Sequence, residues 1–188
     1  MMTRTVLCIR HGESTFNAAA RAAAIDPLHF DARLSAIGRE QVRQARSAVL
    51  RYPVELVITS PLTRALQTTA GLFDDHPSAP RIEVSALVRE RVENSCDLGR
   101  SPIELAAEFP SLQFAHLDGV WWHADGVADH RGVCIEPVAV VQARVAEFRS
   151  YLSSRPESVI AVVGHGTFLS YLTGTFLDNC EVVELLLE

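Results

Sequence analysis

The chain has 188 residues, 48% of them hydrophobic, and a formal net charge of −6. This length and apolar content suffice for one globular domain over residues 1–188. An acidic chain is not expected to bind nucleic acid, because such binding needs a basic surface to neutralise phosphates. No apolar stretch approaches the ~18 residues of a membrane span and the N-terminus lacks signal-peptide features, so we expect a cytoplasmic protein without a membrane partner.

All 17 basic residues are arginines, and the chain contains no lysine. This excludes a P-loop nucleotide site and Schiff-base chemistry, both of which require a lysine side chain. A site for an anion must therefore be built from arginines. The four cysteines are widely spaced, which predicts reduced thiols and neither disulfides nor a zinc site.

Three short apolar runs predict β-strands at residues 3–9, 54–59 and 158–163. Because these runs do not alternate with polar residues, we expect strands that are covered on both faces. Residues 82–84 could add a further strand. The C-terminal run "EVVELLLE" fits either an edge strand or a short helix, and its pattern does not distinguish them.

Helical spacing of apolar residues predicts helices within residues 42–52, 62–73 and 138–152. Ser35 and the pair Ser60-Pro61 are start signals for the first two, and "SPIE" at 101–104 is a capping box that opens a short helix. The alternation predicts an α/β fold of three layers, with a mostly parallel central sheet and helices on both faces. Residues 74–136 interrupt the alternation and are expected to form a lid-like insertion.

Side chains that suit an anion follow three of the predicted strands. Arg10 and His11 come directly after the first strand, and Arg64 lies in the first turn of the helix after the second. His165 follows the third strand, between two glycines. Each residue alone could be an ordinary strand end or a buried core histidine. Their joint placement at the carboxyl edge of a parallel sheet, beside a helix N-terminus, favours a phosphate-sized pocket.

Four segments carry a specific family pattern in order: "RHGEST" from Arg10, "DARLSAIGREQ" from Asp31, "ITSPLTRALQTT" from Ile58 and "VVGHGTF" from Val162. Together they resemble the histidine phosphatase superfamily, also called phosphoglycerate-mutase-like. A match of four ordered motifs over the whole chain is far more specific than Arg-His-Gly alone. The resemblance implies a phosphoglycerate-mutase-like fold and a small phosphorylated substrate.

The resemblance also implies roles for individual residues. His11 is implied as the nucleophile that becomes phosphorylated, and His165 as a second catalytic histidine that also binds phosphate. Arg10, Arg64 and Asn17 are implied as further ligands of the phosphoryl oxygens.

These roles agree with elementary chemistry. A neutral imidazole can attack phosphorus near neutral pH if its other nitrogen is held by an acceptor, and a backbone carbonyl near Gly12 would serve His11. Planar guanidinium groups match the charge that spreads over the phosphoryl oxygens during transfer. His165, if protonated, would add a third positive donor.

A carboxylic acid must also protonate the leaving alkoxide and later accept a proton from water. The resemblance places this acid after a strand in the middle of the chain, where "ALVRERVENSCDLGRS" makes Glu90 the candidate and Glu93 the alternative. This mechanism requires no cofactor and no metal.

The residues after Glu90 resemble the plant and fungal phosphoglycerate-mutase-like branch, which has a Cys-Asp-x-x-Arg-Ser run followed by Phe-Pro; here these are Cys96–Ser101 and Phe109-Pro110. The chain lacks the "ERHYG"-type run and the additional arginines of true mutases. A mutase must exclude water from its intermediate, so this absence favours a phosphatase. A phosphomutase and a non-catalytic module that binds a phosphorylated ligand are the alternatives. The identity of the substrate stays open, and an exposed C-terminal strand could pair two copies into a homodimer.

The predicted lid contains His116, His123 and His130 at intervals of seven residues, next to several aspartates. Intervening glycines disfavour one continuous helix, so a polar loop is favoured over a metal site. At least one of Trp121 and Trp122 is expected to anchor this segment to the core.

Overall fold

The computed structural model describes residues 4–23 and 25–187, and its centre is a five-stranded sheet of order β3-β2-β4-β1-β5. The four strands from β3 to β1 run parallel, and β5 pairs antiparallel with β1 at the edge. The predicted mostly parallel sheet is therefore confirmed. The strands are β1 (Arg4–Arg10), β2 (Leu56–Thr59), β3 (Arg81–Val84), β4 (Val159–Gly164) and β5 (Val182–Leu187).

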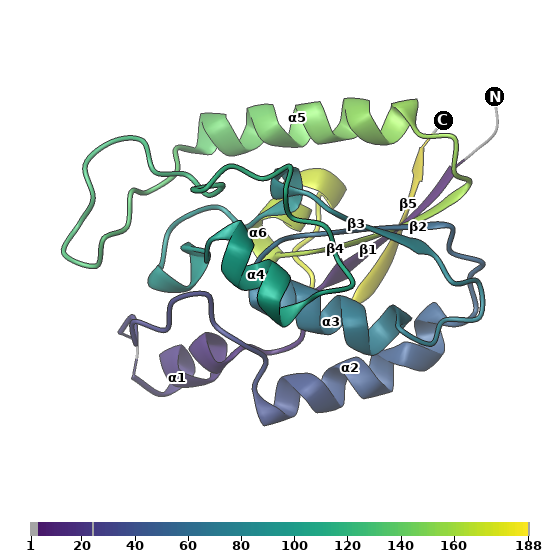
Figure 1. The fold of residues 1–188 in the computed structure, drawn as a ribbon, viewed down its shortest axis with the longest axis horizontal. Coiled ribbons are helices and arrows are strands. Elements are labelled where there is room, and N and C mark those ends of the chain that lie inside the picture. The colour runs from purple at the N-terminus through teal and green to yellow at the C-terminus, as the bar shows by residue number, and fades with distance from the viewer. Residues whose placement is uncertain (1–3, 24, 188) are drawn as a thin grey trace.

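Helices cover the sheet on both faces, as Figure 1 shows: α5 and α6 lie on one side, and α2 and α3 on the other. The predicted three-layer α/β architecture is confirmed. The helices are α1 (Thr15–Ala23), α2 (Ala36–Val49), α3 (Thr63–Phe73), α4 (Pro102–Glu108), α5 (Val138–Ser154) and α6 (Gly166–Thr173), with single 3₁₀ turns η1 (Ala86–Val88) and η2 (Ser95–Asp97).

The apolar run of β1 shows why these strands carry no polar alternation. Val6 and Cys8 face the core beneath α5 and α6, whereas Leu7 and Ile9 face the core formed with α2 and α3. All four side chains are fully buried. Successive residues of a strand point to opposite faces, so a strand inside a three-layer fold needs an apolar residue at every position.

The strand register brings the carboxyl ends of three strands to one edge of the sheet. Arg10 of β1 pairs with Gly164 of β4, and Thr59 of β2 pairs with Val163 of the same strand. The backbone N–H of His11 donates to the carbonyl of Gly164 over 3.0 Å, which extends the ladder one residue further. The residues that follow each strand are therefore neighbours in space.

Several predicted boundaries need correction. Strand β2 begins at Leu56, because Val54 is still held in a turn by a hydrogen bond from its N–H to the carbonyl of Tyr52. Helix α3 begins at Thr63 and not directly after Ser60-Pro61, because the Ser60 hydroxyl accepts the N–H of Leu62 and caps the preceding turn. Ser35 does cap α2, as predicted. The predicted start of β1 at residue 3 lies outside the described residues.

Other segments add elements that the patterns left open or missed. The C-terminal run forms the edge strand β5. Helices α1 and α6 were not predicted, because each is shorter than three turns and too short to display a clear helical period. Among the described residues, no helix has the length and apolar character needed to cross a membrane.

Trp121 fastens the segment 74–136 to the start of helix α3, because it packs in one apolar cluster with Leu62 and Leu66. Within the segment, the indole N–H of Trp121 donates to the carbonyl of Arg100 over 2.9 Å, and its ring lies against Gly99, where an added Cβ would be 2.0 Å from a ring carbon. Trp121 thus anchors this segment as expected, and the close approach explains why a glycine stands at position 99.

A close backbone contact fixes the loop between β1 and α1 against the start of α2. A Cβ added at Gly38 would lie 2.0 Å from the carbonyl oxygen of Glu13, and one at Gly12 would lie 2.7 Å from the carbonyl oxygen of Gly38. Glycine at these positions therefore lets α2 support the loop that follows His11.

We expect Gly38→Ala to lower the free energy of unfolding by about 1–3 kcal/mol or more, because overpacking against backbone forces the loop to shift. Urea unfolding measures the change. The matched control is Gly119→Ala, since an added Cβ there meets nothing within 4 Å. Equal stability of the two variants would contradict the assigned contact.

Candidate functional site

A small polar cavity of about 90 Å³ lies at the carboxyl edge of the sheet. It brings together five of the residues predicted from the sequence: Arg10, His11, Asn17, Arg64 and Glu90. His165 packs directly against His11, with 5.0 Å between the ring centroids. The other residues that line the cavity are Ser14, Phe16, Arg91, Glu93, Asn94, Cys96, Asp97 and Thr167.

The ring of His11 is held in one orientation by two contacts. Its Nδ1 lies 2.7 Å from the carbonyl oxygen of Gly12, and its Nε2 accepts a hydrogen bond from Nε of Arg64 over 3.3 Å. A carbonyl oxygen only accepts and an arginine N–H only donates, so the proton is on Nδ1 and the lone pair on Nε2. The predicted acceptor near Gly12 is thus present, and the ring holds the neutral tautomer that a nucleophile requires.

Arg64 is buried in the first turn of α3 and is oriented by an acid that the sequence reasoning did not assign. Its Nη2 donates to Asp97 over 2.9 Å, and its Nη1 donates to the carbonyl of Cys96 over 2.6 Å. The second carboxylate oxygen of Asp97 accepts the N–H groups of Glu93 and Asn94. The Asn-x-x-Asp spacing is a capping pattern, which indicates that Asp97 accepts backbone N–H groups but gives no sign of its pairing with Arg64.

Arg10 and Asn17 each use part of their hydrogen-bonding capacity on the protein and present the rest to the cavity. Arg10 donates to the carbonyl of Leu177 over 2.7 Å and stacks on the Phe176 ring at 4.9 Å. Its buried Nε has no partner among the described residues. Asn17 Oδ1 accepts from the N–H and the hydroxyl of Ser14, which leaves the amide Nδ2 as the free donor.

Glu90 is bound at the N-terminus of α6. Its carboxylate accepts the backbone N–H groups of Thr167 and Phe168, each over 3.1 Å, and that of Arg91 over 2.8 Å. The alternative acid, Glu93, is 41% exposed and forms an ion pair with Arg91. Both carboxylates line the cavity, but only Glu90 is fixed by a helix N-terminus.

Burial and neighbouring charges set the protonation states of the site. Burial lowers the pKa of His11 well below its usual value, and the positive charge of Arg64 lowers it further. Burial likewise lowers the pKa of His165, with added repulsion from Arg64 and His11. Both histidines are therefore neutral at neutral pH when no anion is bound. In this state His165 carries no positive charge, so it is not the third positive donor that a protonated ring would be.

The pKa of Glu90 is shifted in the opposite direction. Burial raises it above the usual value and the nearby Asp97 raises it further, although the N–H groups of Thr167 and Arg91 act against this change. The site thus pairs a neutral imidazole with a carboxyl group that retains its proton to higher pH than usual. A neutral imidazole and a protonated carboxyl group are the chemical types that can serve as a nucleophile and a general acid.

Several polar atoms of the site are buried without a hydrogen-bond partner among the residues that the structure describes; they include both ring nitrogens of His165 and Nε of Arg10. Buried polar groups in folded proteins almost always have a hydrogen-bond partner. A tetrahedral oxyanion in the cavity would supply acceptors for several of these groups. Among residues 4–23 and 25–187, no group of three or more His, Cys, Asp and Glu side chains is arranged to hold a metal ion.

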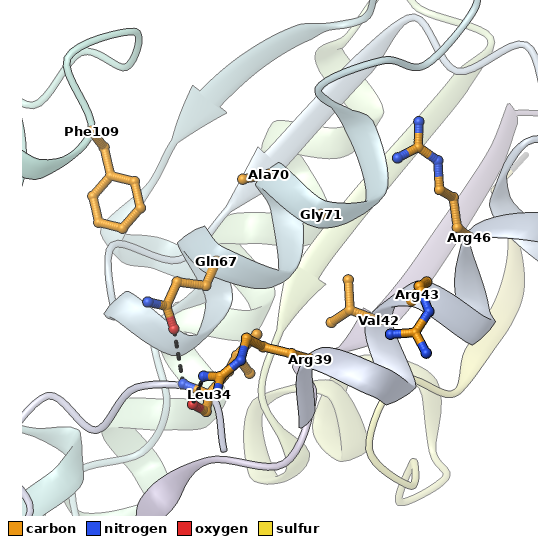
Figure 2. A pocket seen from close by; sticks show the side chains of 9 residues that line it. All are labelled: Leu34, Arg39, Val42, Arg43, Arg46, Gln67, Ala70, Gly71 and Phe109. Carbon is orange, nitrogen blue, oxygen red and sulfur yellow. Dashed lines mark hydrogen bonds between the residues drawn. The ribbon is translucent and has the colours of Figure 1, made fainter. Parts of the chain in front are cut away.

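A second hollow, separate from this site, lies on the outer face of α2 and α3 (Figure 2). Its volume is about 360 Å³, and arginines of α2 and the ring of Phe109 border an apolar floor that includes Val42 and Gly71. None of the predicted site residues lines it. The residues chosen from the sequence therefore gather in the smaller, polar cavity.

Comparison with known proteins agrees with the geometry. The sequence profile of the "Histidine phosphatase superfamily (branch 1)" matches residues 6–185. The chain belongs to the histidine phosphatase superfamily. Enzymes of this superfamily act on small phosphorylated substrates, as phosphatases or mutases.

Two curated members of the superfamily are similar over most of their length. A "Phosphoglycerate mutase-like protein" of Arabidopsis thaliana is 29% identical over 211 residues, which cover 94% of this chain and 76% of the relative. A "Glucosyl-3-phosphoglycerate phosphatase" of Mycolicibacterium vanbaalenii is 26% identical, over 97% of this chain and 80% of the relative. The match to plant members agrees with the resemblance seen in the sequence.

Solved structures share the fold. A putative alpha-ribazole-5'-P phosphatase from Escherichia coli superposes with a TM-score of 0.68 at 21% identity, covering 96% of this chain and 89% of that one. The predicted phosphoglycerate-mutase-like fold is thereby confirmed.

The low pKa values of His11 and His165 predict that acid destabilises the protein. In the unfolded chain both rings take up protons near pH 6.5, whereas in the folded chain they stay neutral. The contribution of each neutral histidine to the free energy of unfolding is therefore fully present above pH ~6.5. It falls toward pH 5 by up to about 1.4 kcal/mol per pH unit for each histidine. We expect His165→Asn to reduce this slope in urea unfolding measured from pH 7 to 5.

His130→Asn is the matched control, because His130 is exposed and lies outside the cavity. It should leave the slope unchanged. Equal slopes for wild type and His165→Asn would contradict a neutral, buried His165.

Proposed function

We propose that this superfamily member is a phosphatase that hydrolyses a small phosphomonoester through a phosphohistidine on His11. The observation that carries the proposal is the tautomer of His11, whose Nδ1–H is held by Gly12 and whose Nε2 lone pair is directed at Arg64 in the cavity. An imidazole fixed in this way is ready for attack on phosphorus, since its nucleophilic nitrogen needs no prior loss of a proton.

In the proposed first step, Nε2 of His11 attacks the phosphorus, and the bond from phosphorus to the ester oxygen breaks. The departing oxygen receives the proton of the Glu90 carboxyl group, so the alcohol leaves neutral and Glu90 becomes a carboxylate. The raised pKa of Glu90 supports this role, because it keeps a larger fraction of the group protonated near neutral pH.

In the second step, water attacks the phosphorus of the phosphohistidine, and the carboxylate of Glu90 accepts the proton of that water. The bond from phosphorus to Nε2 breaks and inorganic phosphate forms. His11 returns to its neutral form and Glu90 to its protonated form, so the cycle is balanced.

Arg10, Arg64, Asn17 and His165 hold the phosphoryl oxygens in this proposal. Their unused polar atoms support it: among the described residues, neither Nε of Arg10 nor the ring nitrogens of His165, one of which donates in the neutral ring, have a hydrogen-bond partner. The two guanidinium groups stabilise the charge that spreads over the phosphoryl oxygens during both transfers. A bound dianion would also favour protonation of His165, which turns one of its ring nitrogens into a donor.

Hydrolysis is preferred to a mutase reaction. The catalytic cavity shares Arg10 and Asn17 with a wider cavity of about 360 Å³, which Ala20, Arg21 and Asn179 also line. This space can admit water beside the phosphohistidine, whereas a mutase must exclude it. The similarity to curated phosphatases also favours hydrolysis. A phosphomutase and a non-catalytic module that binds a phosphorylated ligand are the alternatives.

The proposal treats residues 1–188 as one domain that acts in the cytoplasm, with residues 74–136 as a lid over the substrate. Support for the lid comes from Arg91, Glu93, Asn94, Cys96 and Asp97, which belong to this segment and line the cavity. Pairing of two copies through β5 remains part of the same proposal.

His11→Ala should abolish turnover of a broad panel of phosphomonoesters, because it removes the proposed nucleophile that forms the phosphoenzyme. Release of inorganic phosphate measures it, and His130→Ala is the exposed control that should retain full activity. The phosphatase proposal fails if wild type and His11→Ala turn over every substrate equally. Phosphoryl exchange that exceeds hydrolysis would favour the mutase.

Glu90→Gln should lower kcat for an alkyl phosphate such as glycerol 3-phosphate by about 10²–10⁴, the usual contribution of a general acid. The loss should be much smaller with p-nitrophenyl phosphate, whose phenolate leaves without a proton. In wild type, kcat/KM for the alkyl ester should fall as pH rises through the raised pKa of Glu90, and the variant should lack that limb. Equal losses on both substrates would exclude Glu90 as the acid, and Glu93→Gln would then be tested.

A further inference from the structure

Glu90 is carried by a loop that has no regular secondary structure of its own. Residues 89–92 follow the single 3₁₀ turn η1 and precede η2, so neither a strand ladder nor a helix fixes their path. A general acid needs an accurate position relative to its substrate. Other contacts must therefore hold this loop, which together with the last two residues of η1 is here called the 87–92 loop.

The acid that holds it is Glu136, which lies outside the cavity and is fully buried. One carboxylate oxygen of Glu136 accepts from Nη2 of Arg89 over 2.8 Å. The other accepts from the backbone N–H of Val92 over 3.2 Å and from Nη2 of Arg144 over 3.1 Å. The carboxylate thus binds the loop on both sides of Glu90, at Arg89 and at Val92.

Arg144 ties the same loop to helix α5. Its Nη1 donates to the carbonyl of Leu87 over 2.9 Å and to that of Arg89 over 2.7 Å. Its guanidinium also lies 5.2 Å from the ring centroid of Phe168, the residue whose N–H binds Glu90. The loop and the start of α6 therefore share one support.

The charges of this cluster show why its acid is needed. Arg89 and Arg144 are both largely buried, and together they bring two positive charges to one carboxylate. Burial lowers the pKa of Arg89 to about 10, and repulsion from Arg144 contributes to that change. Without the carboxylate, two like charges would face each other in a region of low dielectric and would separate. The loop segments that they bind would move with them.

The backbone of Glu136 reinforces the grip. Its N–H donates to the carbonyl of Val92 over 2.8 Å, and its carbonyl accepts Nε of Arg91 over 2.9 Å. Every residue from 89 to 92 therefore makes a direct contact with Glu136 or Arg144; Glu90 does so through its backbone carbonyl, which accepts Nη2 of Arg144 over 3.5 Å. The carboxylate of Glu90 is left to face α6 and the cavity.

We propose that Glu136 is a positioning residue for the reaction: together with Arg89 and Arg144 it fixes the 87–92 loop and so holds the Glu90 carboxyl where the leaving oxygen departs. This inference rests on the proposed function, since it concerns the geometry of the acid at that site. Glu136 does not itself touch the substrate.

The test is Glu136→Gln, which keeps the shape of the side chain and removes its charge. We expect kcat for glycerol 3-phosphate to fall about tenfold or more, a part of the ~10²–10⁴ that a general acid supplies, and kcat for p-nitrophenyl phosphate to change less than about threefold. KM for both substrates should change little, because Arg10, Arg64 and His165 are untouched. Glu136→Asp should recover part of the loss on glycerol 3-phosphate.

The control for stability is Leu152→Ala, which removes a fully buried side chain from the other end of α5 and does not touch the loop. It should lower the unfolding midpoint without a difference between the two substrates. If Glu136→Gln does not fold, Arg89→Gln tests the same grip, since it leaves the Glu136–Arg144 pair intact; it should show the same dependence on the leaving group.

The outcomes separate the two proposals. In one outcome, the loss of kcat in Glu90→Gln depends on the leaving group, but the loop variants that fold lose activity equally on both substrates or lose none. Glu136 is then merely structural and the proposed function stands. If neither His11→Ala nor Glu90→Gln alters turnover, the proposed function itself fails.

Discussion

The structure of the site depends on one constraint, the parallel register of β1 with β4. Pairing of Arg10 with Gly164 carries His11 and His165 past the end of the sheet together, so that their rings pack 5.0 Å apart. A shift of one residue in either strand would turn its buried side chains to the opposite face and disrupt the close packing of both apolar layers, which opposes such a shift. The helices of the two outer layers therefore fix the position of the site as well as the core.

Electrostatics gives this edge of the sheet its chemical character. Burial, together with the positive charges of Arg64 and Arg10, lowers the pKa of both histidines and keeps them neutral. Asp97 holds Arg64 in place and adds to the rise in the pKa of Glu90 that burial causes. The chain as a whole has a net charge of −6, so this cluster of positive groups is opposite in sign to the net charge of the protein. A phosphoryl group entering the cavity would be attracted by the arginines and would meet the uncharged imidazole of His11, the nucleophile of the proposed reaction.

The sequence was informative where function depends on short segments that end a strand. Arg10, His11 and His165 come at the ends of apolar runs, and Arg64 lies in the first turn of the helix after another, so their convergence followed from the rule for parallel sheets. Glu90 was placed only by family resemblance, because no strand or helix delivers it to the cavity. The contacts of Asp97 and Glu136 were not predicted from the sequence, since each joins groups that only the tertiary fold brings together.

The segment 74–136 shows most clearly what local patterns omit. Its course is set by long-range contacts, such as Trp121 on Gly99 and Asp26 with Ser95 and Arg131. These partners are 22 to more than 100 positions apart, and no periodic pattern in the sequence predicts such contacts. A lone glutamate in the apolar run "VCIEPVAVV" was the one signal for the buried charge cluster around Glu136.

The most direct measurement traps the intermediate. Wild-type protein is mixed with ³²P-labelled phosphomonoester and quenched within the first turnover, and the labelled peptide is then identified. The account predicts a phosphoryl group on Nε2 of His11 that is stable in base and lost in acid, and that disappears on a chase with unlabelled substrate at the rate of turnover. Release of phosphate at full rate with no label on His11 at any time would contradict it.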